Sequence, residues 1–226
     1  MFSLRVSQIR VHNNHTAKPF LGGHPGVDVE LFSIVSTNSQ GIKGIDSVVN
    51  ASDLASLQTA LKGALSATVN TMTLPQVHDN TLYPLGGTTG WEVCSGDTEP
   101  DSIEWIFGIM KASSQPGAAT NSLFDLLTSD PRIATLSGIA SIIVPGVTPA
   151  IAASTKVLQT VGQLFNAIPG TPAGPNLLGA LHVSLNRAMH YPTGFFAPTN
   201  VPDPSNTVLL DYVVQYISTP APAVKP

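Results

Sequence analysis

The sequence predicts an α+β fold: an antiparallel β-sheet or sandwich built from N- and C-terminal strands, with helices inserted between them. Apolar residues alternate near both ends of the chain, whereas the middle shows a helical repeat. Only 11% of the 226 residues are charged, against about 25% in an average protein, and 19 Gly and 19 Pro indicate many turns. We expect one domain over residues 1–218 and a flexible, proline-rich tail at 219–226.

The N-terminal segment has the alternation of a half-buried strand. Its phase slips by one residue at Ser7 or Gln8, which is typical of a β-bulge. Residues 27–38 predict a second strand after a turn-rich interval, and the spacing favours an antiparallel pair between the two strands. The alternating residues of the first strand are Phe2, Leu4, Val6, Ile9 and Val11.

A leucine stripe then predicts a helix that begins near Ser52. Its residues recur every three or four positions and are Leu54, Leu57, Leu61 and Leu65. β-Branched residues favour a strand from Thr68 to Leu74 that ends at Pro75. Residues 77–96 are expected to form a loop.

Residues 102–113 fit either a helix or a strand, and we favour a strand because Ile, Trp and Phe dominate. A short helix is expected at 121–127. The uncharged stretch 133–168 then predicts a central apolar helical hairpin, broken near Pro145. Thr148 before Pro149 has the form of a helix start, and a strand at 140–144 is the alternative for the first half of the hairpin.

Two further strands are expected near the C-terminus, after a turn at 169–176. The first begins at Leu177, and the second covers residues 206–218. The second strand has apolar residues on both faces, so we expect it to lie inside a sheet.

The composition excludes some classes of protein and favours others. A net charge of −4 with ten scattered Lys and Arg argues against nucleic-acid binding. Arg5 and Arg10 interrupt the first apolar residues, so we expect no secretory signal and a cytoplasmic location. The single cysteine excludes an internal disulfide.

The densest acidic segment is a candidate calcium site. Asp97, Glu99 and Asp101 stand at every second position, and calcium takes six to eight oxygen ligands. An EF-hand loop counted from Asp97 requires glycine and glutamate where this chain has Ser102 and Gly108. We therefore favour a solvated loop in which Asp101 caps the next element, with Glu104 completing a capping pattern.

Two other constellations have catalytic or metal-binding residue types. Cys94 is a candidate nucleophile if His78 or His190 approaches it, since a thiolate needs a base or a positive neighbour. The four residues of a second metal-site hypothesis are His12, His15, His24 and Asp28. A turn explains the histidines equally well, and the segments typical of phosphate loops, zinc proteases and dinucleotide sites are missing from the sequence.

These observations favour a non-enzymatic binding or assembly protein with a low-charge, turn-rich surface, whose ligand is a protein or a small molecule. Self-assembly into a homo-oligomer is compatible with the same surface. One alternative is a membrane-active protein that uses the apolar hairpin 133–168, although each half is too short to cross a bilayer. The other is a hydrolase-like enzyme that uses Cys94 or the acidic loop 97–101.

Overall fold

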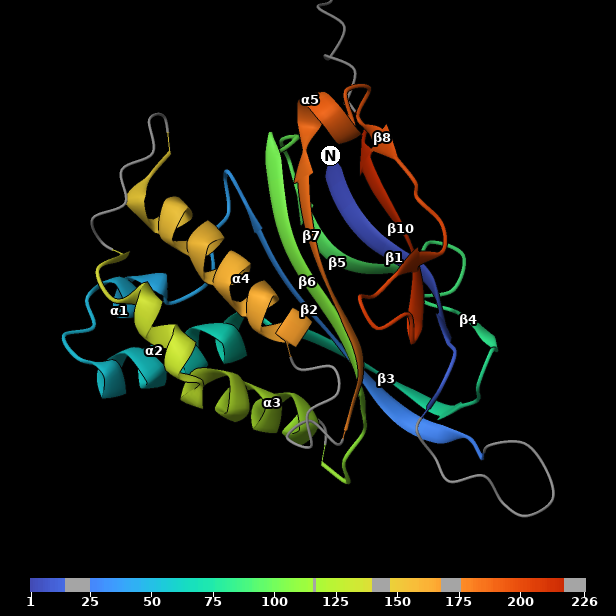
Figure 1. Ribbon diagram of the computed structural model, residues 1–226. Helices are drawn as coiled ribbons and strands as arrows, with labels where there is room; N and C mark the ends of the chain where they lie inside the picture. Colours follow the sequence, from blue (N-terminus) through green and yellow to red (C-terminus); the bar gives the residue numbers. More distant parts are fainter. Residues whose placement is uncertain (15–24, 116, 140–146, 168–175, 218–226) are drawn as a thin grey trace, which may run out of the picture.

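The computed structural model describes residues 1–14, 25–115, 117–139, 147–167 and 176–217. It has two antiparallel sheets that pack face to face, and helices cover the outer face of one of them (Figure 1). The α+β prediction is therefore confirmed. The predicted tail at 219–226 lies outside the described residues, and the extent of the domain stays a prediction.

The first sheet has six strands and joins the two ends of the chain. β1 and β10 pair at its centre, β4 and β5 extend it beside β1, and β8 and β9 extend it beside β10. The pairing of β1 with β10 shifts between Val6 and Gln8, which confirms the bulge, and β10 lies inside the sheet as expected. The strands are β1 (Phe2–Val11), β4 (Leu82–Pro84), β5 (Trp91–Gly96), β8 (Phe195–Phe196), β9 (Val201–Pro202) and β10 (Val208–Tyr216).

The second sheet has four strands in the order β3-β2-β6-β7 and lies between the first sheet and the helices (Figure 1). Eight consecutive residues of β6 are buried, as a strand covered on both faces requires. The predicted strand at 102–113 and the one beginning at Leu177 are both confirmed. The strands are β2 (Val27–Thr37), β3 (Asn70–Val77), β6 (Ser102–Lys111) and β7 (Leu177–Asn186).

The helices other than α5 gather on the outer face of this second sheet (Figure 1). Asp53 caps α2 by accepting from the Ser56 N–H at 2.8 Å, one residue after the predicted start. Pro149 begins α4, and the Ile151 N–H donates to Thr148 Oγ1 at 3.4 Å, as the sequence predicts. The helices are α1 (Ile45–Val49), α2 (Leu54–Thr68), α3 (Ala118–Ser129), α4 (Pro149–Ala167), α5 (Arg187–His190) and the 3₁₀ helix η1 (Pro131–Leu136).

The central apolar hairpin is confirmed in its second half. The buried side of α4 packs on the β2-β6-β7 face through residues such as Val157, Val161 and Phe165. The first half contains only the short helix η1 within the described residues, and both its predicted break and the alternative strand at 140–144 lie largely outside them. Among the described helices, none is long and apolar enough to cross a membrane.

Three predictions about the strands are wrong. β1 and β2 do not pair, because they belong to different sheets, and spacing alone does not distinguish a hairpin from a crossing between sheets. The expected loop 77–96 contains β4 and β5, both of which pair with β1. β3 continues through Pro75 to Val77. It is an edge strand, and an edge strand tolerates proline on the side where the missing N–H would form no hydrogen bond to a neighbouring strand.

A glycine in β6 sets how closely the helical layer approaches the sheet. The Phe32 ring lies over Gly108, and its centroid is 5.8 Å from that of Phe165 in α4. A Cβ atom at residue 108 would lie 2.2 Å from Phe32 Cζ. The aromatic cluster therefore depends on the absence of a side chain there.

We expect Gly108→Ala to lower the free energy of unfolding by about 1–3 kcal/mol, because the new methyl group displaces the Phe32 ring. Gly63→Ala in α2 is the matched control: its Cβ meets nothing within 4 Å, and it should raise stability by about 0.5–1 kcal/mol. Urea unfolding measures both values. Equal stability of the two variants would contradict the packing of Phe32 on Gly108.

Candidate functional site

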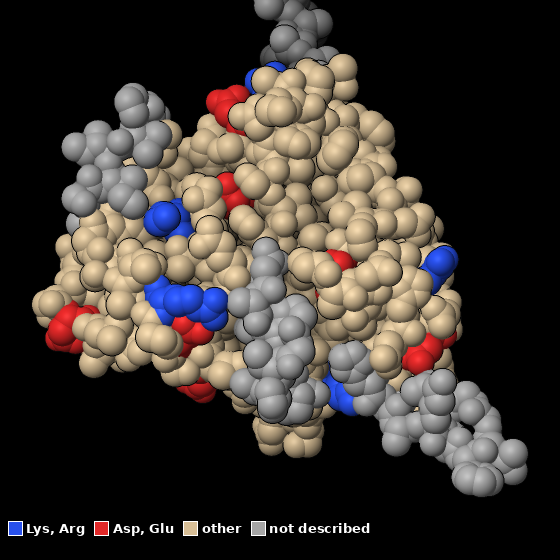
Figure 2. All heavy atoms as spheres, viewed as in Figure 1, with Lys and Arg blue, Asp and Glu red and all other residues tan. Residues whose placement is uncertain are grey.

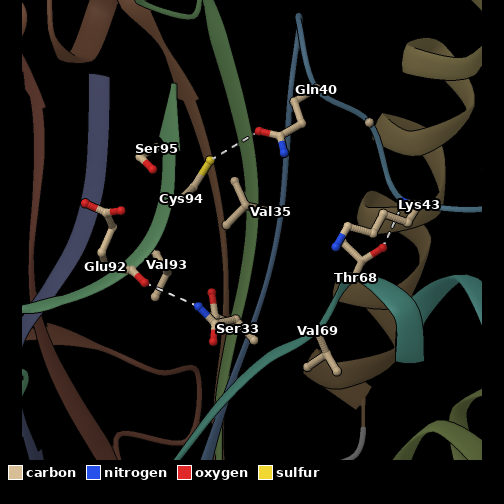
Figure 3. A pocket seen from close by; sticks show the side chains of 12 residues that line it. Ser33, Val35, Gln40, Lys43, Thr68, Val69, Glu92, Val93, Cys94 and Ser95 are labelled. Atoms are coloured by element: carbon tan, nitrogen blue, oxygen red, sulfur yellow. Dashed lines mark hydrogen bonds between the residues drawn. The ribbon is translucent and has the colours of Figure 1, made fainter. Parts of the chain in front are cut away.

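A groove opens at one edge of the sandwich, between β2 of one sheet and β5 of the other (Figure 3). Its volume is about 410 Å³, within the range of about 300–1,000 Å³ found for small-ligand sites. Four separate segments of the chain line it: β2, the loop after β2, the junction of α2 with β3, and β5. The residues that matter for its chemistry are Val35, Gln40, Lys43, Thr68, Glu92 and Cys94.

The groove exists because β2 is longer than its neighbour β3. β6 pairs with β2 as far as Thr37, whereas β3 pairs with it only as far as Ser33. β3 begins at Asn70, immediately after α2 ends at Thr68. The last part of β2 therefore has no strand on its β3 side, and the groove lies along this uncovered edge.

The charges at the groove favour an anionic group. The Glu92 carboxylate forms an ion pair with Arg5, with 3.0 Å between Oε2 and Nη2. The Lys43 backbone N–H donates to Thr68 Oγ1 at 2.9 Å, which fixes the loop that carries the lysine. The Lys43 ammonium itself has no carboxylate partner within the described part of the chain, so it contributes an uncompensated positive charge.

Cys94 lies on the β5 wall and faces Gln40 across the groove (Figure 3). Its thiol donates to Gln40 Oε1 over 3.8 Å. Burial, and secondly the negative charge of Glu92, raise the pKa of the Cys94 thiol to about 11. The thiol is therefore protonated at neutral pH, which is the opposite of what a nucleophilic cysteine needs.

The histidines that a hydrolase would require have other neighbours. His190 Nδ1 lies 3.0 Å from the backbone nitrogen of Asn186, and its ring packs against Phe196. The His78 backbone N–H donates to the Tyr83 hydroxyl at 2.7 Å. No contact of either histidine with Cys94 is found among the described residues, so the structure does not assemble the predicted cysteine–histidine pair.

The acidic loop is held by an arginine. Arg187 Nη2 lies 2.8 Å from Glu99 Oε2, and its Nη1 lies 3.7 Å from Asp101 Oδ1, while Asp97 is exposed. The described residues contain no group of three or more His, Cys, Asp or Glu side chains placed to hold a metal ion. The calcium site stays a prediction, and two of its three carboxylates, Glu99 and Asp101, already have a cationic partner.

The capping interpretation of the same loop is wrong, because the element that follows is a strand. Asp101 accepts from Asn38 Nδ2 at 3.3 Å and so joins the loop to the end of β2. Glu104 points from β6 toward the helical layer instead of toward Asp101. A β-strand has no row of free N–H groups at its start that a carboxylate could cap.

The histidine set near the N-terminus is only partly described. His12 Nδ1 lies 2.7 Å from Asn80 Oδ1, and Asp28 accepts from the Gln76 N–H at 3.0 Å. His15 and His24 lie outside the described residues, so this metal hypothesis stays a prediction.

A second polar cluster lies beneath α4, around the buried carboxylate of Glu104. The Glu104 carboxylate accepts from Ser184 Oγ at 2.9 Å and from Gln159 Nε2 at 3.2 Å, and His182 Nε2 lies 2.9 Å from its other oxygen. Ser184 and His182 both bond to the carboxylate and not to each other, so the histidine does not activate the hydroxyl as a base would. We interpret this cluster as an anchor for α4, whose Gly162 lies against the His182 ring.

Charge is sparse over the surface. Figure 2 shows Lys, Arg, Asp and Glu scattered over the viewed face without a large patch of one sign. This distribution agrees with the 11% charged composition and offers no basic stripe on that face. No protein-family model matches the chain, and no curated protein matches it either.

Sequence reasoning identified Cys94 but missed the rest of the groove. The missed residues come from segments up to about sixty positions apart and share no motif. Lys43 had one local indication: Gly41 and Gly44 on either side place it in a turn directly after a strand. That pattern indicates exposure but not the cavity beside it.

We expect calcium to leave the melting temperature unchanged, because Arg187 already forms an ion pair with Glu99 and lies beside Asp101. The measurement is thermal unfolding with calcium or with a chelator. A rise of several degrees that Asp97→Asn abolishes would establish the calcium site instead.

The alkylation rate of Cys94 by iodoacetamide should rise with pH around a midpoint of about 11, above the ordinary thiol value of 9.0. Glu92→Gln should lower this midpoint, because it removes a negative charge that disfavours the thiolate. Asp97→Asn is the control outside the groove and should leave the midpoint in place. A midpoint near 9 in the unaltered protein would show that Cys94 is not buried.

Proposed function

We propose that this chain is a non-enzymatic binding protein and that the groove between β2 and β5 is its ligand site. The observation that carries the proposal is the groove itself: about 410 Å³, with hydrogen-bonding side chains on its walls and the unpaired Lys43 at its margin. Sites of this size with a few polar groups are typical of ligand recognition.

The chemistry of the groove supports binding over catalysis. Cys94 is its candidate nucleophile, and a pKa of about 11 keeps that thiol protonated. Its hydrogen-bond partner is the Gln40 amide oxygen, which is not a base of useful strength. Lys43 can attract and orient an anionic group without any covalent step.

The groove can be blocked by covalent modification of Cys94, because this is the only cysteine in the chain. A maleimide attached to its sulfur would occupy the space between β5 and Gln40. The blocked protein is therefore a control that differs from the free protein only at this site.

We expect at least one compound in a panel of amino acids, small carboxylates and short peptides to raise the melting temperature of the free protein but not of the maleimide-blocked protein. Saturation at a hundred times Kd stabilises a protein by about 2.7 kcal/mol, which is readily detected. The same compound should slow alkylation of Cys94.

Two variants sharpen this measurement. Lys43→Glu reverses the charge at the groove, whereas Lys156→Glu makes the same change on an exposed part of α4 outside it. Binding should be lost in the first variant and kept in the second. A panel in which no compound discriminates the free from the blocked protein would overturn the proposed site.

A further inference from the structure

The walls of the groove contain backbone N–H and C=O groups without hydrogen-bond partners among the described residues, as well as side chains. On β2, the Asp28 carbonyl accepts from the Ala112 N–H at 2.8 Å, and the Asn38 N–H donates to the Ser102 carbonyl at 3.3 Å. Asp28 lies in β2 and Asn38 directly follows it, so even-numbered positions along this strand bond to the β6 side. Because backbone groups alternate between the two edges of a strand, odd-numbered residues of β2 turn theirs away from β6.

This alternation leaves one residue of β2 without a backbone partner on its outer edge. Ser33 is the last residue that pairs with β3, and the Thr37 N–H is taken by the Gln40 carbonyl at 2.8 Å. Val35 stands between them and lines the groove. Its N–H and C=O point into the groove, and neither has a partner among the described residues.

The opposite wall has the same property. The Ile217 N–H donates to the Met1 carbonyl at 2.9 Å, which shows that odd-numbered residues of β1 bond to β10 before the bulge. Even-numbered residues therefore face β5, and Leu4 lies opposite Cys94. Ser95 is paired with the odd-numbered Ser3, so its N–H and C=O point away from β1.

We infer that the groove binds an extended, acidic peptide segment that adds to the sheet edges as a β-strand. Its backbone pairs with Val35 on the β2 wall and with Ser95 on the β5 wall, and a carboxylate side chain reaches Lys43. Addition of a strand to a free edge is an established mode of peptide recognition, in which the main chain supplies affinity and side-chain contacts supply selectivity. This inference rests on the proposed function, because it names the ligand class of the same groove.

A peptide fits these walls better than a compact small molecule does. Each wall presents one backbone donor and one backbone acceptor, and a peptide backbone repeats the complementary pair every two residues, about 6.6 Å apart. Unpaired backbone groups on a strand edge attract further strands unless they are covered. Lys43 adds charge selectivity because the groove's own carboxylate, Glu92, is already paired with Arg5.

The test starts from a phage-displayed library of random heptapeptides selected on the full chain. Enriched peptides should contain Asp or Glu. Synthetic copies with capped ends should bind to the protein, as measured by calorimetry, and should protect Cys94 from alkylation. Copies with N-methyl groups on alternate residues keep every side chain but lose the N–H groups of one edge. Their affinity should fall roughly tenfold or more.

Proline variants test the protein side of the same bonds. Ser95→Pro and Val35→Pro each remove one N–H that faces the groove and takes no part in a ladder, so both should fold and bind the peptide roughly tenfold more weakly. Ser95 is exposed, so its variant gives the answer even if Val35→Pro is unstable. Lys43→Gln should weaken acidic peptides but not their amide copies, whereas Lys156→Gln should change neither.

Three outcomes overturn the inference: no enriched peptide, N-methylated copies that bind as tightly as their parents, or peptide binding that the blocked Cys94 leaves intact. Its failure is distinguishable from failure of the proposed function. If small carboxylates protect Cys94 while no peptide is enriched, the groove remains a ligand site and only the peptide inference falls.

Discussion

Burial of the four-stranded sheet on both faces is the constraint on which the rest of this structure depends. Odd-numbered residues of β2 and β6 face the other sheet, and even-numbered residues face the helices. A carboxylate on either face is removed from water and is costly unless it has hydrogen-bond partners. Glu30 and Glu104 are 2% and 7% exposed, and both point into the helical layer.

These two carboxylates locate helices. Glu30 accepts from the backbone N–H groups of Gly117 and Thr120 at 2.8 and 3.2 Å, so the start of α3 is held against β2 by the groups that a helix leaves unpaired. Glu104 accepts from Gln159 and in this way holds α4. The buried charges therefore contribute to the placement of the helices, where apolar packing alone tolerates sliding.

Local sequence patterns predicted the helices and strands much better than they predicted which strands pair with each other. The bulge in β1, the start of α4 and the interior position of β10 all depend on neighbouring residues, and each was predicted from the sequence. The supposed pairing of β1 with β2 was wrong because the choice of partner depends on which apolar faces meet in three dimensions. β4 and β5 were missed because both are short and are separated by a glycine-rich turn, and only burial of Trp91 between the sheets reveals the second.

The candidate site was largely beyond sequence reasoning for the same reason. The groove results from the difference in length between β2 and β3, and that difference is set by where α2 ends, at Thr68. No motif in the sequence predicts this difference in strand length. Cys94 is the one groove residue with recognisable chemistry, and it suggested a nucleophilic reaction that its burial disfavours.

An uncovered strand edge is ordinarily a site of aggregation, and the outer edge of β3 has two features that disfavour pairing with another chain. Pro75 removes a donor from that edge, and Gln76 adopts a φ of 51°, which breaks the regular row of groups that another strand would need. Val35 has neither safeguard, yet it lies inside a groove between β5 and the end of α2, where only a segment thin enough to enter can reach it. In the binding mode that we propose, the shape that protects this edge from whole sheets also admits a single extended strand, so protection and recognition at this position share one structural origin.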